Sequence, residues 1–172
     1  MLRSPLRKLA LLAGLSALVT TVAIAGPPWI AIEYPANPHD PGTRGALLTV
    51  RTYHHGELIS YQLAGTAEGI VNGRRQSMPL DVRRLPQAGM YAVRFQKPAQ
   101  GNWMLVITSS QQNGAFAASA LVTIDSGGGV ASVSVPSGTI ENGRWRVPRR
   151  VASAEIDAML KNAAATTVAR RQ

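Results

Sequence analysis

From Trp29 to Val135 the chain alternates between short strand-like segments and compact turn sequences, and this alternation constrains the fold more than any other feature. Within the segments, apolar residues recur at every second position, which is the period of a strand with one buried face. Glycine, proline, asparagine and aspartate cluster between the segments, about every eight to twelve residues. Two sheets that bury their apolar faces against each other produce this pattern. The sequence therefore predicts an all-β, immunoglobulin-like β-sandwich.

Eight segments fit the strand pattern, and the turns between them contain residues that favour tight reversals. The segments are residues 29–34, 46–53, 59–71, 76–85, 90–96, 102–109, 116–124 and 130–135. Asn72-Gly73 is the strongest hairpin signal, because a type I′ turn needs positive φ at both central residues. Gly65 and Gly69 interrupt the third segment, so we expect them to bend that strand or to form a β-bulge.

The pattern changes after the last of these strands. Asn142-Gly143 lies between two short strand-like segments and predicts a smaller terminal hairpin. From Ser153 onward apolar residues recur at helical spacing, and Ser153 is the predicted N-cap. We expect the helix to dock on its own domain; the alternative is a partner-binding tail joined through Pro148-Arg149-Arg150. The chain is therefore divided into a sandwich at 26–135 and a terminal hairpin with a C-terminal α-helix at 136–172.

The first 25 residues have the layout of a secretory signal peptide. A cationic start with Arg3, Arg7 and Lys8 precedes an apolar run that closes on Ala23-Ile24-Ala25. These small residues predict cleavage before Gly26. The alternative is an uncleaved anchor, because an apolar run of about 17 residues reaches the lower limit for spanning a bilayer. We expect a periplasmic or secreted protein with no transmembrane segment after cleavage.

The composition narrows the chemistry further. The chain has no cysteine, which excludes disulfides, thiolate metal sites, cysteine nucleophiles and a cysteine-linked lipid anchor. Without the predicted signal peptide, fifteen lysines and arginines oppose nine acids, so the mature chain carries a net charge of +6. In an exported protein this charge favours an envelope protein or an anionic surface as partner. We expect no nucleic-acid ligand.

Between about residues 50 and 108, two predicted strands each begin with a glycine that is followed two residues later by an aromatic residue. Gly89-Met90-Tyr91 begins one segment, and Pro98 precedes Gly101-Asn102-Trp103 at the start of the next. In this order the chain resembles the YtkA-like and FixH-like group of bacterial extracytoplasmic domains. The resemblance implies an immunoglobulin-like sandwich in which Tyr91 and Trp103 point into the core. Relatives in that group are linked to copper handling or respiratory-oxidase assembly, but no ligand motif carries over to this chain.

The three histidines, His39, His54 and His55, are the candidate metal ligands. Neighbouring residues on a regular strand point to opposite faces, so His54 and His55 can share an ion only where the strand ends. Gly56 follows them and loosens this restriction. With His39 from a neighbouring loop they form a candidate copper site. The soft ligands considered for Cu(I) are Met78, Met90 and Met104.

Two arginine pairs are the candidate binding residues. Arg74-Arg75 and Arg83-Arg84 flank one predicted hairpin, so we expect a compact cationic patch; the alternative is an ordinary solvated basic surface. The carboxylates are scattered singly, and the chain has neither a Gly-x-Ser-x-Gly elbow nor a phosphate-binding loop. We therefore expect that the protein is not an enzyme.

These observations predict a non-catalytic, exported accessory or interaction domain of the bacterial cell envelope, with no cofactor. The alternative is a periplasmic copper-binding protein that uses histidine and methionine ligands. The two hypotheses differ in a simple respect, because copper should stabilise the second kind of protein and leave the first unchanged.

Overall fold

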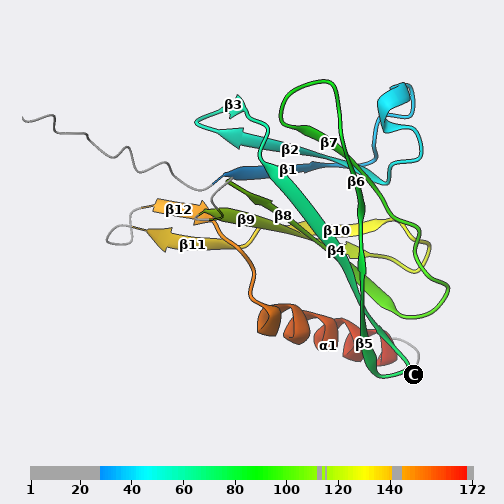
Figure 1. Cartoon of the computed structure of the whole chain (residues 1–172). Coiled ribbons are helices and arrows are strands. Elements are labelled where there is room, and N and C mark those ends of the chain that lie inside the picture. Colours follow the sequence, from blue (N-terminus) through cyan, green and yellow to red (C-terminus); the bar gives the residue numbers. More distant parts are fainter. Residues whose placement is uncertain (1–27, 112–113, 115, 141–144, 170–172) are drawn as a thin grey trace, which may run out of the picture.

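The computed structural model describes residues 28–111, 114, 116–140 and 145–169. It contains two five-stranded antiparallel sheets, a two-stranded sheet and one helix near the C-terminus (Figure 1). The predicted all-β sandwich with a C-terminal helix is confirmed. The predicted signal peptide at residues 1–25 and the Asn142-Gly143 turn lie outside the described residues.

The two large sheets form the layers of the sandwich. The first sheet has the strand order β1-β2-β7-β6, and a short strand also pairs with β2. Its strands are β1 (Trp29–Glu33), β2 (Leu48–His54), β3 (Glu57–Leu58), β6 (Asp81–Arg84) and β7 (Met90–Arg94). The second sheet has the order β10-β9-β8-β4-β5. Its strands are β4 (Gln62–Val71), β5 (Arg74–Pro79), β8 (Asn102–Ser110), β9 (Ala117–Ile124) and β10 (Val130–Ser134).

Three smaller elements complete the described chain. A short 3-10 helix, η2 (Pro41–Thr43), lies between β1 and β2. The predicted terminal hairpin is present as β11 (Ser137–Ile140) paired with β12 (Trp145–Pro148). The helix is α1 (Ser153–Ala169). No helix in the described part of the chain has both the length and the apolar character needed to cross a membrane.

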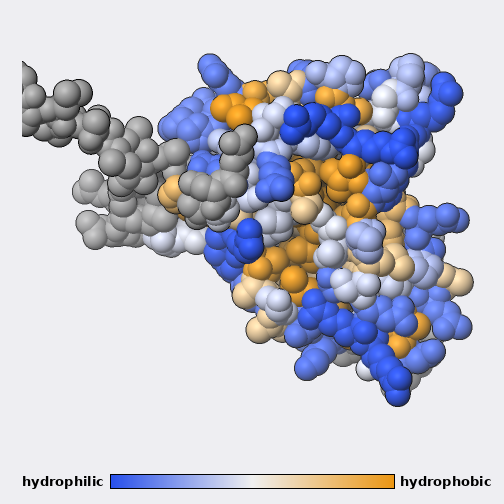
Figure 2. All heavy atoms as spheres, in the orientation of Figure 1, coloured by the Kyte–Doolittle hydropathy of each residue, from blue (hydrophilic) through white to orange (hydrophobic). Residues whose placement is uncertain are grey.

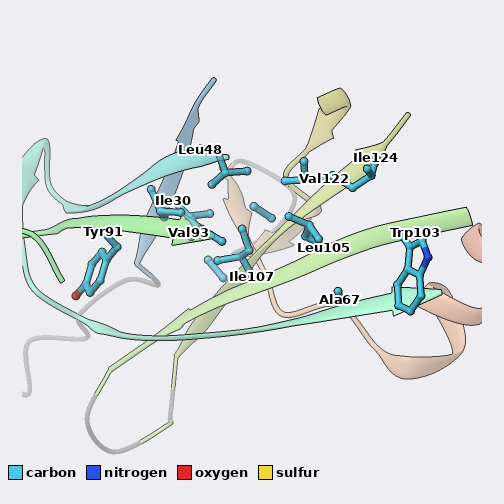
Figure 3. Packing of buried hydrophobic residues seen from close by; sticks show 13 residues of the cluster. Ile30, Leu48, Ala67, Tyr91, Val93, Trp103, Leu105, Ile107, Val122 and Ile124 are labelled. Atoms are coloured by element: carbon cyan, nitrogen blue, oxygen red, sulfur yellow. The ribbon is translucent and has the colours of Figure 1, made fainter. Parts of the chain in front are cut away.

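Alternate residues of the two sheets face each other and form the main core (Figure 3). Trp103, Leu105 and Ile107 alternate along β8 and are all buried, as their spacing predicts. The indole N–H of Trp103 donates to the main-chain oxygen of Gln100 at 2.8 Å, which satisfies its polar atom. Tyr91 is also buried, so both aromatic side chains point into the core as expected.

Gly65 and Gly69 do not form a bulge, so that one of the two alternatives expected for them was wrong. The register between β4 and β8 runs without a shift through both glycines. A Cβ at Gly69 would lie 2.6 Å from Cε3 of Trp103, and one at Gly65 would lie 2.8 Å from Cδ1 of Leu80. These glycines are therefore sites of close approach between β4 and its neighbours, where any larger side chain would collide.

The segment predicted as one strand over residues 76–85 is in fact two strands in different sheets. β5 pairs with β4 in the second sheet, whereas β6 pairs with β7 in the first. Leu80 is the single residue between them, and its main-chain N–H donates to the oxygen of Gly65 at 3.0 Å. The extended pattern continues through the crossing, so the local sequence gives no sign of it. As a result, β5 and β6 form adjacent edges on one side of the sandwich (Figure 1).

The helix docks on the outer face of the second sheet and adds a third layer. Ile156 and Leu160 pack with Val151 against an apolar cluster on the sheet, and all three are buried. The sheet residues of this cluster are Met104, Val106 and Leu121, with Ile70 partly buried beside them. The prediction that the helix covers its own domain is therefore confirmed.

The start of the helix differs from the prediction. The main-chain oxygen of Ala152 accepts hydrogen bonds from the N–H groups of Glu155 and Ile156, so Ala152 rather than Ser153 is the capping residue. The carboxylate of Glu155 reaches back and accepts from the Ala152 N–H at 3.0 Å. This is the acidic half of a capping box, and an alanine at the cap leaves the other half unmade.

Candidate functional sites

Arg75, one of the four predicted binding residues, is occupied in holding the fold together. Its guanidinium donates to the Glu68 carboxylate from Nε at 3.1 Å and from Nη2 at 3.0 Å. Nη1 pairs with the carboxylate of Asp157 on the helix. Arg75 on β5 therefore links β4 to α1, and its charge is balanced twice within the molecule.

Glu68 is the buried end of this network, with only 5% of its surface exposed. Besides Arg75, it accepts hydrogen bonds from Thr66 Oγ1 at 2.7 Å and from Ser77 Oγ at 2.8 Å. Burial by itself would raise the pKa of Glu68, but the hydrogen bonds from Thr66, Ser77 and Arg75 outweigh it and hold the pKa below its ordinary value. The carboxylate is therefore charged and fully engaged beneath the helix.

A second arginine clamp fixes the other end of the helix attachment. Nη1 and Nη2 of Arg149 donate to the two carboxylate oxygens of Glu155 at 2.7 and 2.6 Å. These bonds, followed by the one from the Ala152 N–H, lower the pKa of Glu155 to about 2. The main-chain oxygen of Arg149 accepts from Ser119 of β9, and Ser119 Oγ accepts from the Val151 N–H at 3.2 Å. The segment that leads into the helix is therefore tied directly to β9.

The other predicted binding arginines lie on the adjacent edge strands. Arg83 on β6 pairs with Asp81 at 3.3 Å, and the Arg84 guanidinium carbon lies 5.9 Å from the centre of the Tyr91 ring. Arg74 follows the Asn72-Gly73 turn and is exposed. The structure therefore separates the two pairs: Arg74-Arg75 belongs to the second sheet and Arg83-Arg84 to the first. Arg74 and Arg84 are the two of the four that form no ion pair within the described residues.

The wider charge balance was not foreseen from the sequence. Five described acids pair with arginine: Glu33, Glu68, Asp81, Glu155 and Asp157. In contrast, several exposed cations form no ion pair with any described residue. These are Arg44, Arg74, Arg84, Arg146, Arg150 and Lys161. Most of the described acids pair with arginines of the same molecule. The excess positive charge therefore lies on exposed side chains that form no such pair.

His54 and His55 come together at the end of β2. His55 has φ of 50° and Gly56 has φ of 85°, so these two residues form the tight turn between β2 and β3. This breaks the strand alternation, and the two imidazole rings meet edge to face with centroids 4.2 Å apart. Tyr61 lies beside them, 6.4 Å from the His54 ring centre. Nε2 of His54 is buried and has no hydrogen-bond partner among the described residues.

The remaining candidate ligands lie elsewhere. His39 is exposed in the loop that precedes β2, whereas His54 ends that strand, so the structure places them at opposite ends of it (Figure 1). Met104 is buried beneath the helix, and Met78 packs against the core between the sheets. Met90 lies on β7 opposite Arg51 of β2. No group of three or more histidine and carboxylate side chains converges within the part of the chain that the structure describes.

Figure 2 shows hydrophilic residues bordering an apolar area on the face where β4 and β6 lie in Figure 1. Partly buried side chains from this side of the sandwich pack against the main core. They are Leu63, Met78, Leu80 and Val82. The described structure thus offers two kinds of candidate site: exposed arginines along the β5 and β6 edges, and the histidine pair at the β2–β3 turn.

Comparison with known proteins adds no further constraint. No protein-family model matches the chain, and no curated protein or solved structure matches it significantly. The resemblance to YtkA-like and FixH-like domains therefore stays a prediction, and the case for function depends on the geometry.

Proposed function

We propose that this chain is a non-catalytic, exported accessory domain of the bacterial cell envelope that binds an acidic partner protein. One observation carries this proposal: within the described residues most acids pair with arginines of the same molecule, while several exposed cations form no ion pair. A surface with unpaired arginines attracts acidic segments over several ångströms and can bind carboxylates in bidentate fashion. Arginine is also enriched in protein interfaces.

The edge formed by β5 and β6 is the surface best suited to such a partner. Arg74 and Arg84 project from neighbouring edge strands of the two sheets and form no ion pair with described residues. An edge strand also presents main-chain N–H and C=O groups that an extended segment can pair with. An acidic strand would thus find both hydrogen-bonding groups and opposite charge along this side.

Binding of a fluorescent, acidic, extended peptide tests this role by anisotropy at low and physiological salt. The double variant Arg74→Glu/Arg84→Glu should weaken binding by at least about tenfold, which corresponds to the loss of about 1.4 kcal/mol. Arg44→Glu/Arg146→Glu changes the net charge equally but leaves the β5 and β6 edge intact, so it should lose much less. Equal losses in both double variants would show a diffuse charge effect and would contradict a dedicated edge. Binding to anionic vesicles that exceeds binding to the peptide would point to a surface rather than a protein.

The export part of the proposal is supported by the sequence of residues 1–25, with its cationic start, apolar run and small residues before Gly26. Expression in a bacterium and separation of periplasm from cytoplasm tests it. The periplasmic form should begin at Gly26 by N-terminal sequencing. A protein that stays in the cytoplasm with residues 1–25 attached would contradict export.

Copper binding is the second candidate, and the contact between His54 and His55 favours it. Imidazole nitrogens suit copper and zinc, and Nε2 of His54 has no hydrogen-bond partner among the described residues. In metal-free protein, Cu(I), Cu(II) or Zn(II) at a hundredfold over the dissociation constant should add about 2.7 kcal/mol to stability. This gain should vanish in His54→Ala/His55→Ala and persist in His39→Ala. Unchanged melting with every metal would remove this candidate.

A further inference from the structure

Apart from the two-residue strand β3, the two large sheets have four edge strands, and these differ sharply in how they are protected. β5 carries Arg74, Arg75 and Pro79, and β6 carries an aspartate and two arginines. β1 ends in Glu33 and lies against β9 and β12. Charges, prolines and covering elements are the usual devices that prevent an edge strand from pairing with another chain. β1 is therefore covered, and the arginines of β5 and β6 disfavour pairing with a second copy of the same strand while they attract an acidic one.

β10 is the fourth edge, and its one protecting device is a register shift of the β-bulge kind. Its five residues, Val130–Ser134, include no charge and no proline. Among the described strands it pairs only with β9, and four of its five residues are exposed. A register shift between Val130 and Ser132 is its one irregularity. β10 thus offers a neutral row of main-chain hydrogen-bonding groups on an otherwise strongly basic molecule.

The inner face of β10 is also uncovered at Val133, although Val130 at the start of the strand packs against the core. Val133 lies opposite Val122, which is completely buried in the core between the sheets. The two side chains therefore point to the same, inner face of the sheet. Nevertheless Val133 is 42% exposed. The first sheet ends at β1, which contacts β9, so the second sheet extends one strand beyond it. The apolar side chain of Val133 is therefore exposed because the first sheet has no strand opposite β10.

We propose that β10 is a self-association edge, at which two copies of this chain pair antiparallel across a two-fold axis and join their second sheets. The charge distribution selects a second copy as the occupant. Symmetric pairing at β5 or β6 would bring arginines together, whereas β10 against β10 places no charge opposite another. An isologous contact also pairs the same neutral strand with itself, as a two-fold axis requires.

The symmetric arrangement predicts a register. A two-fold axis at Ser132 places Ser132 opposite Ser132 of the second copy and Ala131 opposite Val133. Val130 stays outside this regular pairing, because the register shift after it puts Val130 and Ser134 on opposite faces. Val133 then gains an apolar neighbour on the face that is bare in the single chain. These few residue pairs bury much less than the roughly 1,000 Å² of a stable interface, so the dimer should be weak and reversible.

The absence of native cysteine allows a direct test of this register in the full-length chain. Self-paired residues have Cα atoms about 4.5–5.5 Å apart, within the range of about 4.4–6.8 Å that a disulfide spans. Ser132→Cys should therefore form a disulfide-linked dimer with oxidised glutathione, which accepts the two electrons and is reduced to two thiols. Ser134→Cys places its two sulfurs roughly 13 Å apart along the strands, so it should cross-link far less. Equal cross-linking of both variants, or none in Ser132→Cys, would overturn the proposal.

Sedimentation of the full-length protein without cysteine provides the second measurement. Between about 10 µM and 1 mM, the sedimentation coefficient should rise with concentration, as expected for a weak dimer. Val133→Lys places like charges near the symmetry axis and should abolish the rise. Gln76→Lys adds the same charge at an exposed position on β5 and should preserve it. A monomer at all concentrations, or association that persists in Val133→Lys, would overturn the proposal, which does not depend on the proposed binding function.

Discussion

At the residue scale, Glu68 shows how a strongly basic chain uses its few acids. The carboxylate is buried and accepts hydrogen bonds from Thr66, Ser77 and Arg75. Without it, each of these groups would lose a hydrogen-bond acceptor. Removing one member of a buried charged network costs more than the network contributes, because the remaining groups lose their partners. Glu68 is therefore a structural residue even though it is charged.

Glu68→Gln should lower the free energy of unfolding by about 2 kcal/mol, because an amide presents N–H groups to donors that now lack an acceptor. The measurement is urea unfolding at pH 7. Glu57→Gln is the matched control, since Glu57 is exposed and forms no ion pair within the described residues. A loss no larger than in the control would show that the network contributes little to stability.

Gly69 is the second residue whose role follows from its surroundings. Gly69→Ala should destabilise the protein by about 1–3 kcal/mol, because the new Cβ overlaps the buried Trp103 ring. Gly138→Ala is a suitable control: its Cβ would lie 3.4 Å from the nearest atom, a side-chain carbon of Arg149. Denaturant midpoints compare the two variants. Equal midpoints would contradict a close approach at Gly69.

At the element scale, the helix is held by apolar contacts and by two arginine clamps, one on β5 and one in the segment between β12 and α1. Ile156 and Leu160 provide the buried surface, while Arg149 and Arg75 orient the helix through Glu155 and Asp157. The apolar contact supplies most of the stabilisation, because exposed ion pairs contribute little at ordinary salt. The clamps mainly select one orientation.

The clamp at Glu155 predicts a pH dependence. Its pKa is about 2 in the folded protein and 4.5 in the unfolded reference, so the unfolded state binds the proton first. The stabilisation is therefore complete above about pH 4.5 and is lost as the pH falls toward about 2; the lowered pKa of Glu68 acts in the same direction. Urea unfolding across this range should show wild type and Glu155→Gln converging at low pH. Parallel curves would contradict the clamp.

The sequence predicted which residues form strands better than it predicted which strands pair with one another. Alternation along a segment indicates which residues share a face, and this correctly placed Trp103, Leu105 and Ile107 in the core. It gives no information about which sheet a strand joins, so the crossing at Leu80 was missed. The unbroken apolar run from Trp103 to Ile107 is typical of a strand buried on both faces, but this signal was missed; the helix accounts for the second buried face.

The candidate sites were harder to predict for the same reason. Arg75 carries no local sign of its two acidic partners, since Glu68 and Asp157 lie on other elements. The meeting of His54 and His55 could be anticipated, because Gly56 permits a tight turn after them. The distance between His39 and this pair could not be anticipated, because it depends on the direction in which β2 runs between them.

At the scale of the whole molecule, the layers are the first sheet, the second sheet and the helix, so the second sheet is buried on both faces. The outer cluster on that sheet contains Met104, Val106 and Leu121. Without the helix these side chains would form an exposed apolar patch on a sheet that remains otherwise intact. Such patches promote association.

A chain that stops after Val151 should therefore be less stable and should bind an apolar fluorescent dye much more strongly than the intact protein. The measurements are urea unfolding and dye fluorescence at equal concentration. Lys161→Ala in the intact chain is the control, because Lys161 is exposed and should change neither quantity. A truncated chain with unchanged dye binding would show that the helix is not a necessary cover.

The order of the layers along the chain also has a consequence during biosynthesis. The strands of the second sheet are made before the helix that covers them, and about forty residues separate Leu121 from Leu160. At about 5–20 residues per second, these apolar strands exist without their cover for roughly 2–8 s. We therefore expect the growing chain to bind a chaperone during this interval and to need it less once α1 has been made.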